Sequence, residues 1–303
     1  MTACAAHGSG SFVATPEGRV YYELEGPSGR PGVVVVGGGP GVGHSHFHPW
    51  FSALADRFQV VYFDYIGTGR SDRLTSARYS IELFAEHLEI LRAHLDFERW
   101  SLVALSFGGM PALEYALRHP GRVSALALSN AQLSAATWQE GNIDHVNAAL
   151  QAHFPERWTE LVALRDRGVR SLDPAYQALL DEVVEHLEWL DPVGRPRLEH
   201  DEHNRLREDV YVSIVGDDPE WRVTGTMAGF DPLPRMAALD VPTLVLTGRW
   251  DRTTTPKIAR LAVDALPDGA EYVVFERSAH RPWAEQTVEY FAALSAFLGR
   301  HAG

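Results

Sequence analysis

Cysteine is almost absent from this chain of 303 residues, since Cys4 is the one cysteine. A single thiol excludes an internal disulfide and a cysteine-rich metal site. No run of 18 apolar residues occurs, so no transmembrane helix is expected. The first residues, MTACAAHGSGSF, also lack the basic and apolar regions of a secretory signal peptide. These absences together predict a cytoplasmic protein.

Basic residues are scarce relative to acidic ones, with 27 Lys and Arg against 40 Asp and Glu and a formal net charge of −13. An acidic surface repels phosphate backbones, so neither nucleic acid nor an anionic membrane is an expected partner. The favoured interpretation of the charge is solubility alone. Apolar residues make up 45% of the chain, which is enough for one large α/β domain or a domain with an insertion.

Strands alternate with helices in the first half of the chain. The first two strands read as an antiparallel hairpin, and the later ones are continuous apolar runs. Such runs predict a parallel sheet covered by helices on both faces, with ligands bound beyond the carboxyl ends of the strands. Strands are expected at 11–15, 19–25, 33–36, 59–64, 101–105 and 123–129, and helices at 47–56, 80–95 and 107–118.

The pattern changes over 132–231, which is charged, rich in Trp and helical in character. Strands return at 243–247 and 271–275, and a last helix is expected at 282–299. Because the strand–helix alternation resumes, we interpret 1–131 and 232–303 as one α/β core and 132–231 as an inserted helical cap. Two consecutive domains are the alternative.

The segment around Ser106 has the pattern of a nucleophile elbow, because it lies between a strand and a helix and small residues flank the serine. Ala104 and Gly108, two positions before and after, avoid crowding in the tight turn. Gly109 allows the helix to lie close to the sheet. Ser106 is therefore the candidate nucleophile.

An acid and a histidine follow Ser106 in the order that this type of hydrolase uses. Asp251 comes after the strand 243–247, and His280 comes after the strand 271–275. Both positions lie at the carboxyl ends of strands. We expect His280 to accept the Ser106 proton and Asp251 to orient the imidazole and stabilise its charged form.

A glycine-rich loop, 37–41, directly follows the strand 33–36. We assign the oxyanion hole to the backbone N–H groups of Gly39 and Phe107. The loop lacks the G-x-G-x-x-G spacing of dinucleotide binding, and no phosphate-binding loop occurs elsewhere, so no cofactor is expected. A second glycine-containing loop, 64–71, is given a structural role.

Three alternating histidines, His44, His46 and His48, have no carboxylates at fixed offsets. No metal is therefore expected. We interpret these histidines as surface or pocket-lining residues.

The motifs in combination resemble the proline iminopeptidases, a family of serine peptidases and amidases. The resemblance rests on GGPG at 38–41, D-x-x-G-x-G-R-S at 64–71, the elbow, G-x-x-D at 248–251, S-x-H at 278–280 and PEWRVTGT at 219–226. It covers nearly the whole chain. It implies an α/β-hydrolase fold with a mostly parallel eight-stranded sheet, helices on both faces and an inserted helical cap.

The resemblance also implies how a substrate is held. In this family a cap glutamate binds the free α-amino group, and Glu220 occupies that position. The second amine-binding glutamate, two residues ahead of the triad aspartate, is Arg249 here. Two further departures are Gly37 in place of a histidine and Ile66 in place of an arginine. Some relatives remove an aminoacyl group from amides made in polyketide biosynthesis, which requires an apolar channel for the leaving group.

Three hypotheses about function follow. The first is an amidohydrolase or aminopeptidase acting on a small molecule or short peptide with a free amine, through an acyl-enzyme on Ser106. The second is an esterase or thioesterase with the same triad and no amine requirement, which Arg249 supports. The third is a ligand-binding protein on a hydrolase scaffold, against which the complete triad argues. Six aromatic residues of the cap could line a channel or form its core: Trp138, Phe154, Trp158, Trp189, Trp221 and Phe230.

Overall fold

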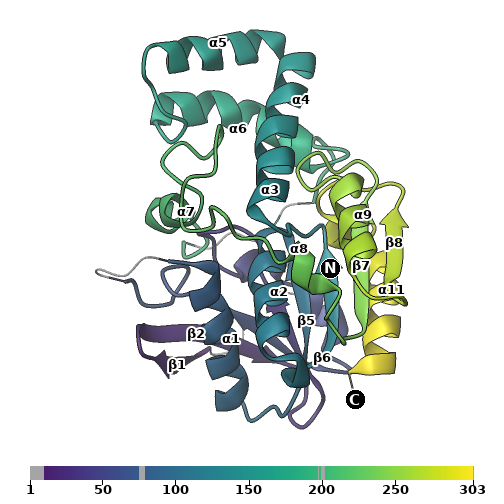
Figure 1. Cartoon of the computed structure of the whole chain (residues 1–303). Coiled ribbons are helices and arrows are strands. Elements are labelled where there is room, and N and C mark those ends of the chain that lie inside the picture. The colour runs from purple at the N-terminus through teal and green to yellow at the C-terminus, as the bar shows by residue number, and fades with distance from the viewer. Residues whose placement is uncertain (1–9, 75–78, 197, 199–201, 303) are drawn as a thin grey trace.

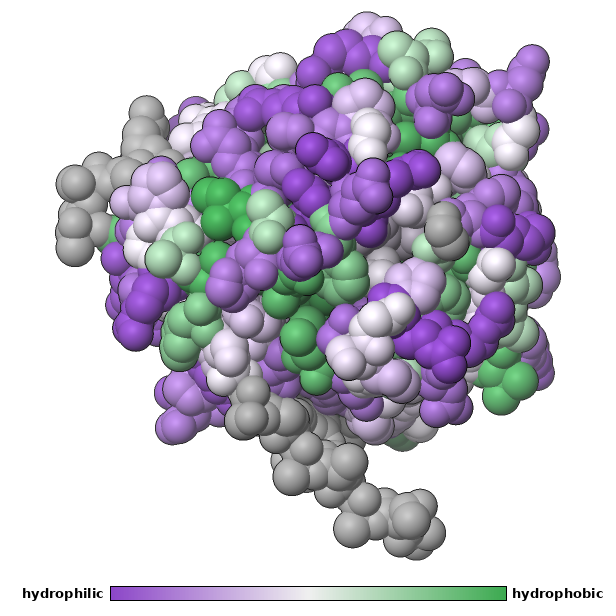
Figure 2. Space-filling model, turned by 90° about the horizontal axis from the view of Figure 1, so that it is seen from below, coloured by the Kyte–Doolittle hydropathy of each residue, from purple (hydrophilic) through white to green (hydrophobic). Residues whose placement is uncertain are grey.

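The computed structural model describes residues 10–74, 79–196, 198 and 202–302 (Figure 1). Cys4 lies outside the described residues. Within them, no helix combines the length and the apolar character that crossing a membrane requires. The face opposite the cap segment (residues 132–231) carries hydrophilic side chains interspersed with small apolar areas, as Figure 2 shows.

Eight strands form one sheet in the order β1-β2-β4-β3-β5-β6-β7-β8. The pairs β1–β2 and β2–β4 are antiparallel, and every other neighbouring pair is parallel. The predicted mostly parallel eight-stranded sheet and its opening hairpin are confirmed. The strands are β1 (Ser11–Thr15), β2 (Gly18–Glu25), β3 (Gly32–Val36), β4 (Gln59–Phe63), β5 (Trp100–Leu105), β6 (Val123–Ser129), β7 (Thr243–Gly248) and β8 (Glu271–Phe275).

The central strands are apolar along their whole length because both faces of the sheet are covered. All residues of β3, β5, β6 and β7 are buried. One apolar cluster joins one face to α1 (Ile81–His94), α2 (Gly109–Arg118) and α9 (Pro256–Ala265). A second cluster joins the other face to α11 (Thr287–His301). The predicted helices on both faces are confirmed.

Two predicted helices differ in the structure. The segment 47–56 forms two short 3-10 helices, Ser45–Phe47 and Trp50–Leu54, because Pro49 between them has no N–H to continue a helical ladder. The last helix is divided into α10 (Pro282–Glu285) and α11, since Gln286 adopts φ −127° and ψ 54°. The side chain of Gln286 accepts a hydrogen bond from the backbone N–H of Arg277 there.

The cap segment leaves the sheet after β6 and the chain returns to it at β7, which pairs with β6. We propose that 132–231 is an inserted cap on a core made of 1–131 and 232–303. In Figure 1 its helices lie above the sheet, with α5 and α6 side by side. The helices between β6 and β7 are α3 (Ala135–Trp138), a π-helical stretch (Gln139–His145), α4 (Val146–His153), α5 (Pro155–Asp166), α6 (Pro174–Glu188), α7 (Glu208–Ile214) and α8 (Leu233–Met236).

The helical prediction for the cap segment holds only in part. The described residues between α6 and α7 and residues 215–231 form turns and irregular backbone. Gly216 and Gly229 have φ of +131° and +82°, a region that favours glycine over other residues and ends a helix. This non-helical stretch carries Glu220 to the cavity described below.

The cap aromatic residues all pack in apolar clusters. Phe154, Trp158 and Trp221 pack on a separate apolar cluster within the cap segment. Trp189 and Phe230 pack on the two clusters of the sheet. Trp138 belongs to the first sheet cluster and also lines the cavity. Packing is therefore an observed role of all six.

Candidate active site

Ser106 occupies the turn between β5 and α2 with φ +51°, a strained conformation for a residue other than glycine. The elbow depends on close backbone approaches. A Cβ on Gly108 would lie 2.1 Å from the carbonyl oxygen of Val36, and one on Gly109 would lie 2.4 Å from that of Gln132. Larger residues at these two positions would push the serine turn away from the sheet.

The glycine loop 37–41 lies directly against Ser106. A Cβ on Gly38 would come within 3.1 Å of the Ser106 Cβ, so only glycine leaves this approach open. Gly39, with φ +129°, lines the same cavity as Ser106. Phe107 is fully buried and follows the serine at the start of the helix. We propose the N–H groups of Gly39 and Phe107 as the oxyanion donors.

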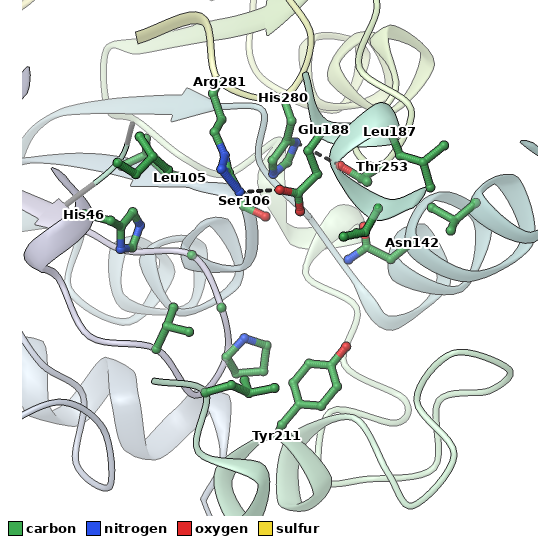
Figure 3. A pocket seen from close by; sticks show the side chains of 18 of the residues that line it. His46, Leu105, Ser106, Asn142, Leu187, Glu188, Tyr211, Thr253, His280 and Arg281 are labelled. Atoms are coloured by element: carbon green, nitrogen blue, oxygen red, sulfur yellow. Dashed lines mark hydrogen bonds and ion pairs between the residues drawn. The ribbon is translucent and has the colours of Figure 1, made fainter. Parts of the chain in front are cut away.

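Asp251 and His280, which follow β7 and β8, are hydrogen-bonded to each other. The Nδ1 of His280 lies 2.8 Å from Oδ2 of Asp251. His280 and Ser106 line one cavity (Figure 3). Among the described residues, the Ser106 hydroxyl makes no hydrogen bond, so it is available to a substrate. The structure therefore brings the three predicted triad residues to one end of the sheet.

The pKa values of this pair are shifted in opposite directions. Burial raises the pKa of Asp251, but the charge of His280 and hydrogen bonds from His280 and Asn130 outweigh it and hold the pKa below its usual value. Burial lowers the pKa of His280, but the charge and hydrogen bond of Asp251 outweigh it, and the pKa ends above its usual value. A carboxylate that stays ionised can stabilise an imidazolium.

Two residues that the sequence did not single out hold Asp251 in place. Asn130, with φ +45°, directly follows β6, and its Nδ2 donates to Oδ2 of Asp251 at 2.6 Å. The hydroxyl of Thr253 donates to Oδ1 of Asp251 at 3.0 Å and lies 2.9 Å from Nδ1 of His280. The sequence could have identified Asn130 as a candidate site residue, because it is polar and directly follows a central strand.

The cavity beside Ser106 has a volume of about 400 Å³ and lies between the core and the cap segment. Much of its lining is apolar, and carboxylates from the cap segment also reach it. The apolar lining includes Val42, Phe47, Trp138, Val146, Leu180, Val184, Leu187, Leu206 and Trp283.

Glu220 lines this cavity from the non-helical part of the cap segment. Burial first, and then the charge of Asp218, raise the pKa of Glu220 to about 7. Its backbone is held by Asn147, whose Nδ2 donates to the Glu220 carbonyl at 2.9 Å. No described residue donates to or pairs with its carboxylate. A half-buried carboxylate without a partner is a ready site for a cation.

Glu188, at the end of α6, is a second carboxylate in the cavity that the sequence reasoning missed. Its carboxylate pairs with Arg281, and its carbonyl accepts the backbone N–H of His280 at 3.0 Å. Figure 3 shows it beside Ser106 and His280. Tyr211 lines the same cavity, and burial first and then the charges of Glu220 and Glu188 raise its pKa. No local motif marks Glu188, since only the fold brings α6 to the triad.

Arg249 does not line the cavity. Its guanidinium makes two hydrogen bonds to Glu276, at 2.9 and 2.6 Å, on the exposed side of the β7–α9 loop. A cationic substrate in the cavity therefore does not meet the Arg249 charge.

The interpretation of the three histidines is correct for one of them. His46 lines the cavity. His44 and His48 are instead buried behind the loop, with Glu23 of β2. The interpretation of these two as surface or pocket-lining residues is wrong. They pack against Glu23, whose strand is distant in the sequence, so no carboxylate at a fixed offset from the histidines could reveal the cluster. Residues 64–71 do not line the cavity, and Asp64 instead accepts hydrogen bonds from the backbone N–H groups of His44 and Arg70.

The protein-family model of the alpha/beta hydrolase fold matches residues 31–282 of the sequence. The chain therefore belongs to the α/β-hydrolase family, and it is a hydrolase by this membership.

Within that family the chain is similar to proline iminopeptidases. It is 25% identical to the proline iminopeptidase of Clostridium botulinum, with 94% of this chain and 96% of that protein covered. It is 28% identical to the enzyme of Levilactobacillus brevis, with 93% and 94% covered. The crystal structure of VinJ matches with a TM-score of 0.82 at 26% identity, covering 97% of this chain and 99% of that one. The proline iminopeptidase of Mycobacterium smegmatis matches with a TM-score of 0.78 at 25% identity and the same coverage. The resemblance to proline iminopeptidases seen in the motifs is confirmed.

Proposed function

We propose that this protein is a serine amide hydrolase that removes an N-terminal or N-linked amino acid with a free α-amine. The observation that carries the proposal is the carboxylate of Glu220, which faces the cavity of Ser106 and His280 without a partner. Esters and thioesters do not require such a group. The names of the similar proline iminopeptidases support the same class of substrate.

The reaction proceeds in two steps. The Oγ of Ser106 attacks the acyl carbon and passes its proton to Nε2 of His280, while the N–H groups of Gly39 and Phe107 hold the oxyanion. The C–N bond then breaks, and the leaving amine takes the proton from His280. Water, deprotonated by His280, attacks the aminoacyl ester and releases the amino acid.

The amine site consists of two carboxylates from the cap segment. The α-nitrogen of a substrate is two bonds from the acyl carbon, about 2.5 Å away, so its anchor must lie beside the triad. Glu188 meets this condition, since its carbonyl accepts the backbone N–H of His280 and its side chain lies beside Ser106 and His280 in the same cavity (Figure 3). Glu220 lines the same cavity and completes the site. Glu188, which also pairs with Arg281, takes the place of the second carboxylate that Arg249 does not supply.

The leaving group occupies the apolar part of the cavity. Leu180, Val184 and Leu187 of α6 line it together with Trp138 and Trp283. This lining favours a large hydrophobic amine, such as a natural-product intermediate, over a short polar peptide.

The test compares substrates with and without the free amine. Wild-type protein should cleave L-alanyl- and L-prolyl-p-nitroanilide and a large hydrophobic alanyl amide, and should cleave their N-acetyl forms at least about 100-fold less well. Replacing Glu220→Gln should lower kcat/KM for the free-amine amides by about 10- to 100-fold, because a charged hydrogen bond is lost. The same variant should leave kcat/KM for p-nitrophenyl acetate within about twofold.

Two controls accompany this comparison. Ser106→Ala should abolish turnover of all these substrates. Glu160→Gln removes an exposed acid of α5 that pairs with Arg157 outside the cavity, and should change nothing. Equal rates on acetylated and free amides would refute the amine requirement and would favour an esterase.

A further inference from the structure

Behind the glycine loop lies a buried cluster of three side chains, Glu23, His44 and His48, which are 4%, 2% and 8% exposed. Glu23 comes from β2, and the two histidines come from the segment that follows the glycine loop. Their ligand atoms all lie within 4.8 Å of one another. The cluster is outside the cavity of Ser106 and has no role in the proposed reaction.

The separations within the cluster are longer than those of usual hydrogen bonds. Nε2 of His44 lies 3.5 Å from Oε1 of Glu23, and Nε2 of His48 lies 3.5 Å from Oε2. Hydrogen bonds between such groups measure about 2.7–3.2 Å. Two zinc–ligand bonds of about 2.1 Å at the tetrahedral angle hold their donor atoms about 3.4 Å apart. The observed separations are close to this distance, with each histidine nearest a different oxygen of Glu23.

The groups around the cluster orient the donor atoms. Oε2 of Glu23 is buried and makes no hydrogen bond to any described residue, whereas Oε1 accepts one from the hydroxyl of Tyr21 at 2.8 Å. Nδ1 of His44 lies 2.8 Å from Oδ1 of Asp64. When that nitrogen donates to Asp64, a neutral ring directs the lone pair of Nε2 toward Glu23. A carboxylate behind a histidine in this way is the usual support of a metal ligand.

From this geometry we propose that Glu23, His44 and His48 bind one divalent transition-metal ion, of which Zn²⁺ fits the two-imidazole, one-carboxylate set best. A water molecule takes the fourth position. The site has a structural role. It connects β2 to the segment 37–48, and Gly39 and His46 of that segment line the cavity.

One neighbour limits the affinity. Nη1 of Arg70 lies 4.0 Å from Oε1 of Glu23, and its positive charge opposes that of a metal ion. Removing this charge should tighten binding by about tenfold or more. A cluster held only by hydrogen bonds around a protonated His44 has no metal affinity, so Arg70→Gln would not tighten metal binding to it.

The test uses the full chain without a histidine tag, treated with a chelator and titrated with ZnCl₂ and CoCl₂. Wild-type protein should bind one ion per chain by calorimetry, gain thermal stability on binding, and develop the visible bands of four-coordinate Co²⁺. His48→Gln and Glu23→Gln should each weaken binding by at least about 10- to 100-fold. Arg70→Gln should strengthen it.

His46→Gln is the matched control, because it removes a histidine from the same segment that faces the cavity instead. It should bind metal as wild type does. The titration of wild-type protein decides the question even if a variant fails to fold. Absence of stoichiometric binding in wild type, or binding that His48→Gln and Glu23→Gln leave unchanged, would overturn the proposal.

Discussion

The side chains around Ser106 and those around Glu220 are held in different ways. Asp251 accepts hydrogen bonds from two backbone N–H groups, from the Asn130 amide and from the Thr253 hydroxyl. Glu220 is anchored through its backbone, by Asn147 and Ser171, and its carboxylate has no described partner. Asp251 is therefore fixed before a substrate arrives, whereas the carboxylate of Glu220 is left for a substrate to pair with.

We propose that this difference divides the chemistry between the two regions. A triad fixed in advance lowers the barrier for any acyl group that reaches Ser106. An unpaired carboxylate with a raised pKa gains most from a cationic ligand, so it selects among acyl groups. Changes in the core should therefore affect all substrates alike, and changes in the cap segment should affect only those that carry an amine.

Among the variants that test this division, Asn130→Ala is expected to have the largest effect on kcat. The substitution removes a donor to Asp251 and places alanine at φ +45°. We expect kcat to fall by about 10- to 100-fold on both aminoacyl amides and p-nitrophenyl acetate, because a small misplacement of the triad is costly. Steady-state kinetics, with thermal unfolding to check folding, measure this.

The counterpart in the cap segment is Asn147→Ala, which removes the donor to the Glu220 carbonyl. It should raise KM for the amides and leave the ester unaffected. A loss confined to amides in Asn130→Ala, or shared by the ester in Asn147→Ala, would contradict the division.

The sequence predicts the core well because the triad lies at the ends of strands. Ser106 directly follows β5, and Asp251 and His280 lie in the loops after β7 and β8. Parallel strands bring such ends to one edge of the sheet. The cap segment offers no comparable rule. Glu188 reaches the cavity because α6 ends there. Arg249 lies outside the cavity, where it pairs with Glu276. Both depend on contacts between elements far apart in the chain.

The buried histidine cluster shows the same limit. His44 and His48 alternate along the sequence, but the acid that joins them belongs to β2. Likewise, the helical composition of the cap segment does not reveal that 215–231 is non-helical, which depends on positive φ at Gly216 and Gly229. Periodicity predicts elements, and it does not predict which side chains from separate elements meet.

A smaller effect is expected from pH. Glu220 binds an ammonium group only when ionised, and its pKa is raised to about 7. Between pH 8 and pH 6 the ionised fraction falls by roughly tenfold, so kcat/KM for an alanyl amide relative to p-nitrophenyl acetate should fall by up to about tenfold. Dividing by the ester rate removes the shared titration of His280.

Glu220→Gln provides the control for this profile, because it cannot ionise. Its ratio should be low and nearly independent of pH between 6 and 7.5. Above pH about 8 the wild-type ratio should fall again as the substrate amine loses its proton. A wild-type ratio that is flat from pH 6 to 8 would mean that Glu220 does not carry the amine selectivity.

The smallest effect is expected at Arg249, the position that separates this chain from the two-glutamate pattern of the proline iminopeptidases. The Arg249 side chain is 45% exposed and pairs with Glu276, and exposed pairs contribute about 0–1 kcal/mol to stability. Arg249→Ala should therefore change kcat/KM by less than about twofold. Arg249→Glu should lower the melting temperature slightly through repulsion from Glu276, and should not improve cleavage of aminoacyl amides, since the side chain faces away from the cavity. A gain of tenfold or more in Arg249→Glu would show that this loop reaches the amine, and that Glu188 does not replace it.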